Sequence, residues 1–131
     1  MTEQIETIIL KVLGRHPRIR LAILFGSLAS GQARLESDLD LAVDTGAPLT
    51  AGEKMALIED LALEIGRPVD LVDLQTAGEP LLGQVVTRGR RVLGSDMHFA
   101  ELIRKHVFDA ADFLPYRTRI LSERRQGWIG K

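Results

Sequence analysis

Two aspartates placed two positions apart, Asp38 and Asp40, are the residues of this sequence best suited to chemistry. They alternate with Leu39 and Leu41, and alternate residues of a β-strand point to opposite faces. Both carboxylates are therefore expected on one face, where their like charges repel unless a cation lies between them. Carboxylate oxygens suit Mg²⁺, so the pair predicts a metal site. The simpler alternative is an acidic pair on a solvated strand face.

A Gly26-Ser27 turn lies upstream of the aspartates and closes the apolar run from Ile19 to Phe25. Glycine lets the backbone approach a ligand closely, and exposed N–H groups together with the Ser27 hydroxyl can hold phosphate oxygens. Taken by itself, the turn is equally explained as the end of a strand. Beside two metal-binding carboxylates, it indicates a site for a nucleoside triphosphate.

A third acid is expected to complete the metal site, and the apolar segment after residue 68 offers Asp70 and Asp73. These two point to opposite faces if the segment is a strand. If Val69 and Leu71 face the core, Asp70 emerges on the same side as the first two aspartates. We therefore expect Asp70 to be the third ligand, against the alternative that either residue is a solvated strand end.

Helices and strands alternate along the chain and must position these residues. Apolar residues at helical spacing predict helices, and short apolar runs bounded by turn residues predict strands. Thr50 followed by Glu53 is typical of a helix start. The expected helices cover residues 3–13, 51–65, 79–88 and 96 to about 126, the last interrupted near residue 115, and the expected strands cover 19–25, 39–43, 69–74 and 90–93.

This order indicates an α/β (α+β) fold, in which helices flank a small mixed sheet of about four strands and a helical extension follows. At 131 residues and 14.5 kDa, the chain suits one domain over residues 1–131, with a core over about 1–95 and the extension over about 96–131. The sequence contains no cysteine, which excludes disulfides and cysteine-based zinc sites. A signal peptide and a membrane span are also not expected, so the predicted location is cytoplasmic.

The net charge of -1 conceals an uneven distribution. Residues 28–73 carry three basic and ten acidic residues, whereas residues 97–131 carry seven basic and four acidic residues. Near the end of the chain, Tyr116 and Trp128 lie among several arginines, and aromatic and arginine residues dominate interface energetics. We expect the segment 116–131 to dock on a partner protein. Nucleic-acid binding is the competing interpretation of a basic tail, although the whole chain is not basic.

A specific motif joins these residues: Gly26-Ser27, ten intervening residues, and then Asp38-x-Asp40, followed by a later Asp in an apolar strand. The pattern resembles the DNA polymerase β-like nucleotidyltransferase superfamily. More closely, the chain is similar to the minimal nucleotidyltransferases (MNT), the antitoxin half of HEPN/MNT toxin-antitoxin pairs. The resemblance covers roughly Ile5 to Gly94.

The resemblance implies that Asp38 and Asp40 bind two Mg²⁺ ions together with the nucleoside triphosphate. It also implies that Asp70 binds the catalytic metal and helps to activate the attacking hydroxyl, and that Gly26 and Ser27 hold phosphate. A two-metal site neutralises charge on both the attacking and the leaving oxygen, which in-line attack at phosphorus requires.

The implied function is that of an antitoxin that transfers AMP from ATP to a tyrosine hydroxyl of its cognate HEPN toxin. A chain this short has no room for a separate acceptor-binding domain, so the acceptor is expected to bring much of its own binding surface. Two alternatives remain: an antitoxin that masks its toxin without catalysis, and an enzyme that modifies a small molecule such as an aminoglycoside.

The family commonly carries an arginine at the position of Ser30, and this departure motivates the masking alternative. Arg34 is one replacement for the missing positive charge. Arg88, Arg90 and Arg91 are also candidates to reach a triphosphate, or else simply flank a strand. The sequence leaves these choices open.

Overall fold

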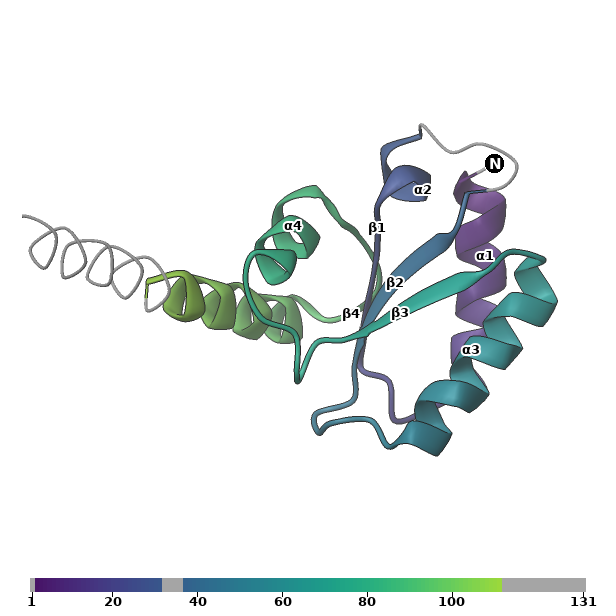
Figure 1. The fold of residues 1–131 in the computed structure, drawn as a ribbon, viewed down its shortest axis with the longest axis horizontal. Coiled ribbons are helices and arrows are strands. Elements are labelled where there is room, and N and C mark those ends of the chain that lie inside the picture. The colour runs from purple at the N-terminus through teal and green to yellow at the C-terminus, as the bar shows by residue number, and fades with distance from the viewer. Residues whose placement is uncertain (1, 32–36, 112–131) are drawn as a thin grey trace, which may run out of the picture.

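The computed structural model describes residues 2–31 and 37–111 (Figure 1). Its helices and strands alternate as the sequence predicts. The last helix, here called the C-terminal helix, is described over residues 96–111. The other elements, in chain order, are α1 (Thr2–Leu13), β1 (Leu21–Phe25), α2 (Ser27–Ser30), β2 (Leu39–Asp44), α3 (Ala51–Ile65), β3 (Val69–Asp73), α4 (Leu81–Arg88) and β4 (Arg90–Gly94).

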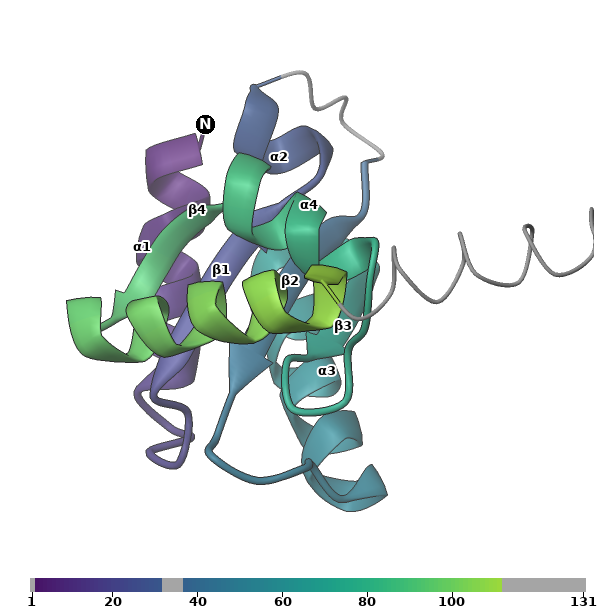
Figure 2. The ribbon, with the colours of Figure 1, turned by 90° about the vertical axis from the view of Figure 1, so that its left-hand side faces the viewer.

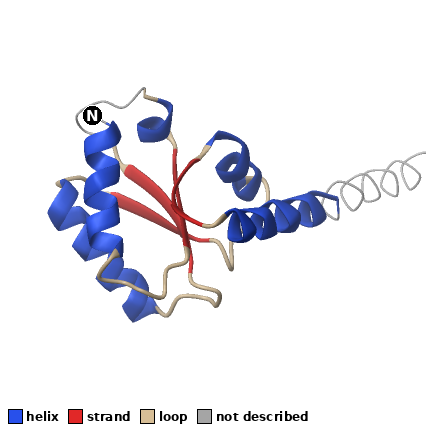
Figure 3. Ribbon diagram, turned by 180° about the vertical axis from the view of Figure 1, so that it is seen from behind, coloured by secondary structure: helices blue, strands red, loops and turns tan. Residues whose placement is uncertain are grey.

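The four strands form one mixed sheet in the order β3-β2-β1-β4. Strand β1 is antiparallel to both β2 and β4, whereas β2 and β3 are parallel and are connected by α3. Helices cover both faces of this sheet (Figure 3). The predicted class, a small mixed sheet of four strands flanked by helices, is confirmed.

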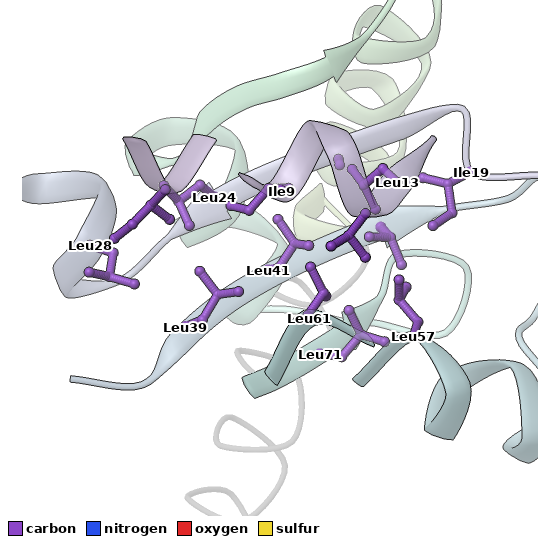
Figure 4. Close-up of a cluster of buried hydrophobic side chains, with 14 residues drawn as sticks. Ile9, Leu13, Ile19, Leu24, Leu28, Leu39, Leu41, Leu57, Leu61 and Leu71 are labelled. Atoms are coloured by element: carbon purple, nitrogen blue, oxygen red, sulfur yellow. The ribbon is translucent and has the colours of Figure 1, made fainter. Parts of the chain in front are cut away.

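One face of the sheet packs against α1 and α3. Leu39, Leu41 and Val43 of β2 point into this layer, where they meet Leu57 and Leu61 of α3 (Figure 4). Each of these five side chains is at most 1% exposed. Burying a leucine side chain contributes about 2 kcal/mol, so this layer holds every second residue of β2 firmly on one face.

The other face of the sheet packs against α4 and the C-terminal helix (Figure 2). Ile23 and Ala42 point into this second layer and meet Leu82, Val85 and Leu102. Strands β1 and β2 are thus covered on both faces, which explains why β1 is a continuous apolar run (LAILF) in the sequence.

Helix α3 begins and ends as its sequence predicts. The Thr50 hydroxyl accepts a hydrogen bond from the Glu53 N–H, and the Glu53 carboxylate accepts one from the Thr50 N–H. Gly66 ends the helix in the left-handed conformation, with φ of 72°. The helices within residues 2–31 and 37–111 are too short or too polar to cross a membrane.

Asp44, at the far end of β2, is a buried acid that is fully engaged in the fold. Its carboxylate accepts hydrogen bonds from Arg20 Nε at 3.0 Å, Gly46 N at 2.9 Å and Gln75 Nε2 at 2.7 Å. Burial opposes ionisation, but these hydrogen bonds and the positive charge of Arg20 outweigh it and hold the pKa of Asp44 below its ordinary value.

We predict that Asp44→Ala lowers the free energy of unfolding at pH 7 by about 2–3 kcal/mol, because it removes the acceptor of three hydrogen bonds and leaves Arg20 only its 3.7 Å ion pair with Glu101. Urea unfolding measures the loss. Since the lowered pKa stabilises the protein only while Asp44 is ionised, the difference from wild type should shrink as the pH falls below the unfolded-state value of 3.8. Glu59→Ala, at an exposed position of α3, is the control and should change stability by less than ~0.5 kcal/mol. An Asp44→Ala protein as stable as this control would contradict the assignment.

Candidate active site

Strand pairing brings two of the predicted acids together. In the parallel pair of β2 and β3, Asp40 lies directly opposite Asp70. Their neighbours Leu39, Leu41 and Leu71 all point into the α1/α3 layer, so both aspartates point to the other face. Adjacent strands are about 4.8 Å apart, and the two carboxylates are therefore neighbours.

Asp38 stands two residues before Asp40 and is exposed. Its negative charge acts on Asp40 from the same side. Burial, followed by the charges of Asp70 and Asp38, raises the pKa of Asp40 above its ordinary value. The negative charges of Asp38 and Asp70 thus both repel the carboxylate of Asp40.

Gly26 is placed where only a glycine fits. It follows β1 directly and has φ of +72°, a conformation that other residues rarely adopt. A Cβ atom at this position would lie 2.2 Å from Oδ2 of Asp40. The missing side chain therefore leaves the space that the Asp40 carboxylate occupies, and it links the glycine turn to the acids.

A cavity of about 600 Å³ opens beside these residues. It lies between α2 and α4, which stand on either side of the end of β1 (Figure 2). Ser27 and Ser30 of α2 contribute to one wall, and the opposite wall comes from α4. The residues that line it are Phe25, Gly26, Ser27, Ser30, Asp40, Gln84 and Arg88. The volume is in the range of small-molecule and cofactor sites.

The sequence does not single out Gln84, and it leaves Arg88 as one of several arginines that could reach a triphosphate. The two residues are one helical turn apart on α4, so they share a face of that helix. That spacing is visible in the sequence. It does not show which end of the sheet the helix covers, because that depends on packing between distant parts of the chain.

Asp73, the alternative third acid, lies at the far end of β3 and contributes to the fold. Its carboxylate accepts hydrogen bonds from Leu49 N at 2.8 Å and Gln75 N at 2.9 Å. It is 8% exposed and lies three residues beyond Asp70. The structure thus separates Asp73 from Asp40 and leaves Asp70 beside it.

The donors on this face suit a divalent cation. Carboxylates arrive from two adjacent strands. Burial and then the charges of Asp70 and Asp38 raise the pKa of Asp40, and a bound cation would relieve the repulsion among these charges. Within the part of the chain that the structure describes, no three acidic, histidine or cysteine side chains are already gathered tightly enough to enclose a metal ion. Complete coordination would therefore include oxygens of a nucleotide or of water, as Mg²⁺ commonly has.

Comparison with known proteins identifies a family and several relatives of this chain. A family model described as polymerase beta, nucleotidyltransferase matches residues 7–98. Protein adenylyltransferase MntA of Shewanella oneidensis is 37% identical over 91 residues, which cover 69% of this chain and 66% of that protein.

Two solved structures share the fold over nearly the whole chain. A chain of a toxin-antitoxin complex crystallised with AMP-PNP has a TM-score of 0.81 at 31% identity, covering 90% of this chain and 96% of its own. A chain of the complex of tri-AMPylated Shewanella oneidensis HEPN toxin with MNT antitoxin has a TM-score of 0.78 at 29% identity, covering 94% and 98%. With the family model matching most of its length, this chain belongs to the polymerase beta nucleotidyltransferase family.

Proposed function

We propose that this protein is an antitoxin that transfers AMP from ATP to a HEPN-family toxin, the acceptor being a tyrosine hydroxyl. The observation that carries the proposal is the placement of Asp40 opposite Asp70 and against Gly26, at the edge of a cavity of about 600 Å³. The similarity to a protein adenylyltransferase, and to complexes that contain AMP-PNP or AMPylated HEPN toxin, supports this choice of donor and acceptor.

In this proposal Gly26 and Ser27 hold the triphosphate. The first N–H groups of a helix have no acceptor within the helix, and α2 begins at Ser27 on the cavity wall. The Ser27 hydroxyl adds a further donor. The turn would thus bind phosphate oxygens on the side of the cavity next to Asp40.

Asp38, Asp40 and Asp70 would hold two Mg²⁺ ions, which neutralise charge on the attacking and leaving oxygens. Asp70 also accepts the proton of the acceptor hydroxyl. The hydroxyl oxygen then bonds to the α-phosphorus while the bond from that phosphorus to the oxygen bridging to the β-phosphorus breaks. Pyrophosphate leaves, and AMP remains on the toxin as a phosphodiester.

The toxin is expected to complete the site, because the described residues that line the cavity are seven and the proposal assigns those beside Asp40 to the nucleotide. The predicted docking segment, 116–131, lies outside the described residues. We further propose that the chain works as a single domain of about 1–95 with its extension 96–131, and that it acts in the cytoplasm, where ATP is available.

We predict that Asp40→Asn reduces AMP transfer by at least roughly 100-fold, because the neutral amide lacks the negative charge with which a carboxylate holds a metal ion. The assay mixes antitoxin, HEPN toxin, ATP and Mg²⁺ and follows the adenylyl mass added to the toxin. Glu59→Gln, an acid-to-amide change at an exposed position of α3, is the control and should leave the rate unchanged.

Two results would contradict this prediction in different ways. Unchanged AMP transfer by Asp40→Asn would overturn the assignment of the acids. Toxin neutralisation that persists without ATP and in Asp40→Asn would favour masking by binding alone, an alternative to which Ser30 on the cavity wall points.

The same substitution should make the protein more stable. Because the pKa of Asp40 is raised in the folded state, ionisation of this group destabilises the fold, and the penalty is fully present above that raised pKa. We expect Asp40→Asn to raise the Tm at pH 7 by a few degrees relative to wild type, and the gain to shrink as the pH falls through the raised pKa of Asp40 and to disappear below the ordinary value of 3.8. Thermal unfolding without nucleotide or Mg²⁺ measures both values, and a lower Tm at pH 7 would refute the charge conflict.

Gly26→Ala should damage both the fold and the reaction. The new Cβ would overlap Asp40 Oδ2 and would require alanine to adopt φ of +72°, at a cost of about 1–2 kcal/mol from the backbone alone. We expect a lower Tm and loss of AMP transfer. Gly52→Ala is the matched control, since nothing lies within 4 Å of a Cβ at this helical position. Equal behaviour of the two variants would show that the close approach of Gly26 to Asp40 has no role.

A further inference from the structure

Three arginines, Arg88, Arg90 and Arg91, lie within four residues where α4 leads into β4, and all three are exposed. The structure gives them different surroundings. Arg90 Nε forms an ion pair with Glu6 Oε1 at 2.5 Å, on α1. Arg91 forms an ion pair with Asp96 Oδ1 at 2.7 Å. These two side chains therefore attach neighbouring helices to β4.

Arg88 differs because its side chain lines the cavity next to Asp40 and Ser27. It makes no ion pair with any acid of the described residues, and it is the one basic residue among the described residues that line this cavity. A guanidinium remains protonated at all physiological pH values, so it brings a permanent positive charge to the cavity wall.

Gly89 fixes the position of Arg88. A Cβ on Gly89 would lie 2.3 Å from the Val85 carbonyl oxygen and 2.4 Å from Ile23 Cγ2. The backbone after Arg88 therefore passes directly against β1, and a larger residue could not follow this path. The last turn of α4 is held over the end of the strand that leads into the Gly26 turn.

The negative charge of a bound triphosphate needs positive charge from more than one wall of the cavity. On the sheet side the cavity presents Asp40 with Asp70 and Asp38 near it, and these act on phosphate only through cations. Among the described residues, the side chains on the α2 wall are neutral, including Ser30, and Arg34 lies outside the described residues. The remaining wall is α4, where Arg88 supplies the charge and Gln84 a neutral hydrogen-bonding group.

Resting on the proposed function, we propose that Arg88 binds the β- and γ-phosphates of ATP and orients the departing pyrophosphate. A guanidinium can donate two parallel hydrogen bonds to phosphate oxygens. Arg88 thus takes the place of a basic residue at position 30. Its contacts are to the part of ATP that leaves, not to the AMP that is transferred.

The test compares two ligands. Isothermal titration calorimetry on the full chain with Mg²⁺ gives the Kd of ATP and of AMP for wild type, Arg88→Ala and Arg88→Lys. We expect Arg88→Ala to weaken ATP binding by about 10- to 100-fold and to leave AMP binding unchanged, because AMP lacks the β- and γ-phosphates. Arg88→Lys should recover part of the loss. Lys54→Ala removes an exposed positive charge from α3, on the other face of the sheet, and should change neither Kd.

Any other outcome contradicts either the role of Arg88 or the proposed function. An unchanged Kd for ATP in Arg88→Ala refutes the proposal. An equal loss of ATP and AMP binding also refutes it, since a positive charge that only stabilises the C-terminal end of α4 would act through the fold and affect both ligands. Arg88→Gln, a neutral variant, is titrated in the same way. If it binds ATP as wild type does while Arg88→Ala has a lower Tm, the residue serves helix stability and the proposal is refuted. If wild type does not bind ATP, the proposed function itself fails.

Discussion

The side chains of β2 point alternately into the two helical layers, and the rest of the structure depends on this constraint. Leu39, Leu41 and Val43 are fully buried against α1 and α3, so the register of the strand cannot slip by one residue without exposing all three. Asp40, which stands between the two leucines, is therefore forced onto the other face. Parallel pairing with β3 then places Asp70 beside Asp40, and the catalytic candidates follow from hydrophobic burial rather than from any attraction between themselves.

The acids at the two ends of the sheet have opposite surroundings. At one end, Asp44 and Asp73 receive hydrogen bonds from backbone and side-chain donors, and they hold loops and Arg20 in place. At the other end, Asp40 faces two further carboxylates and its pKa is raised. Acids that are paired within the protein stabilise the fold, whereas acids left in mutual repulsion are a feature of functional sites, where a ligand supplies the missing charge.

Most of the fold was predictable from local signals. The boundaries of α3 follow from Thr50, Glu53 and Gly66, whose roles depend only on neighbours a few residues away. The boundaries of β1 and α4 differ from those expected by two residues at their starts, because the ends of elements are set by contacts that have no local signature. The choice of Asp70 over Asp73 as the neighbour of Asp40 also follows from strand parity alone.

The sequence by itself determined the types of residue, their spacing and hence which residues share a face within each strand or helix, because these periodicities are properties of the local backbone. Only the tertiary structure decided which elements meet. It set Gly26 against Asp40, brought α4 to the end of β1, and turned Arg88 to the cavity while Arg90 and Arg91 were engaged by acids elsewhere. Apart from the local pair of Arg91 and Asp96, these contacts join residues that lie 14 to more than 80 positions apart in the chain, where no local rule specifies the partner.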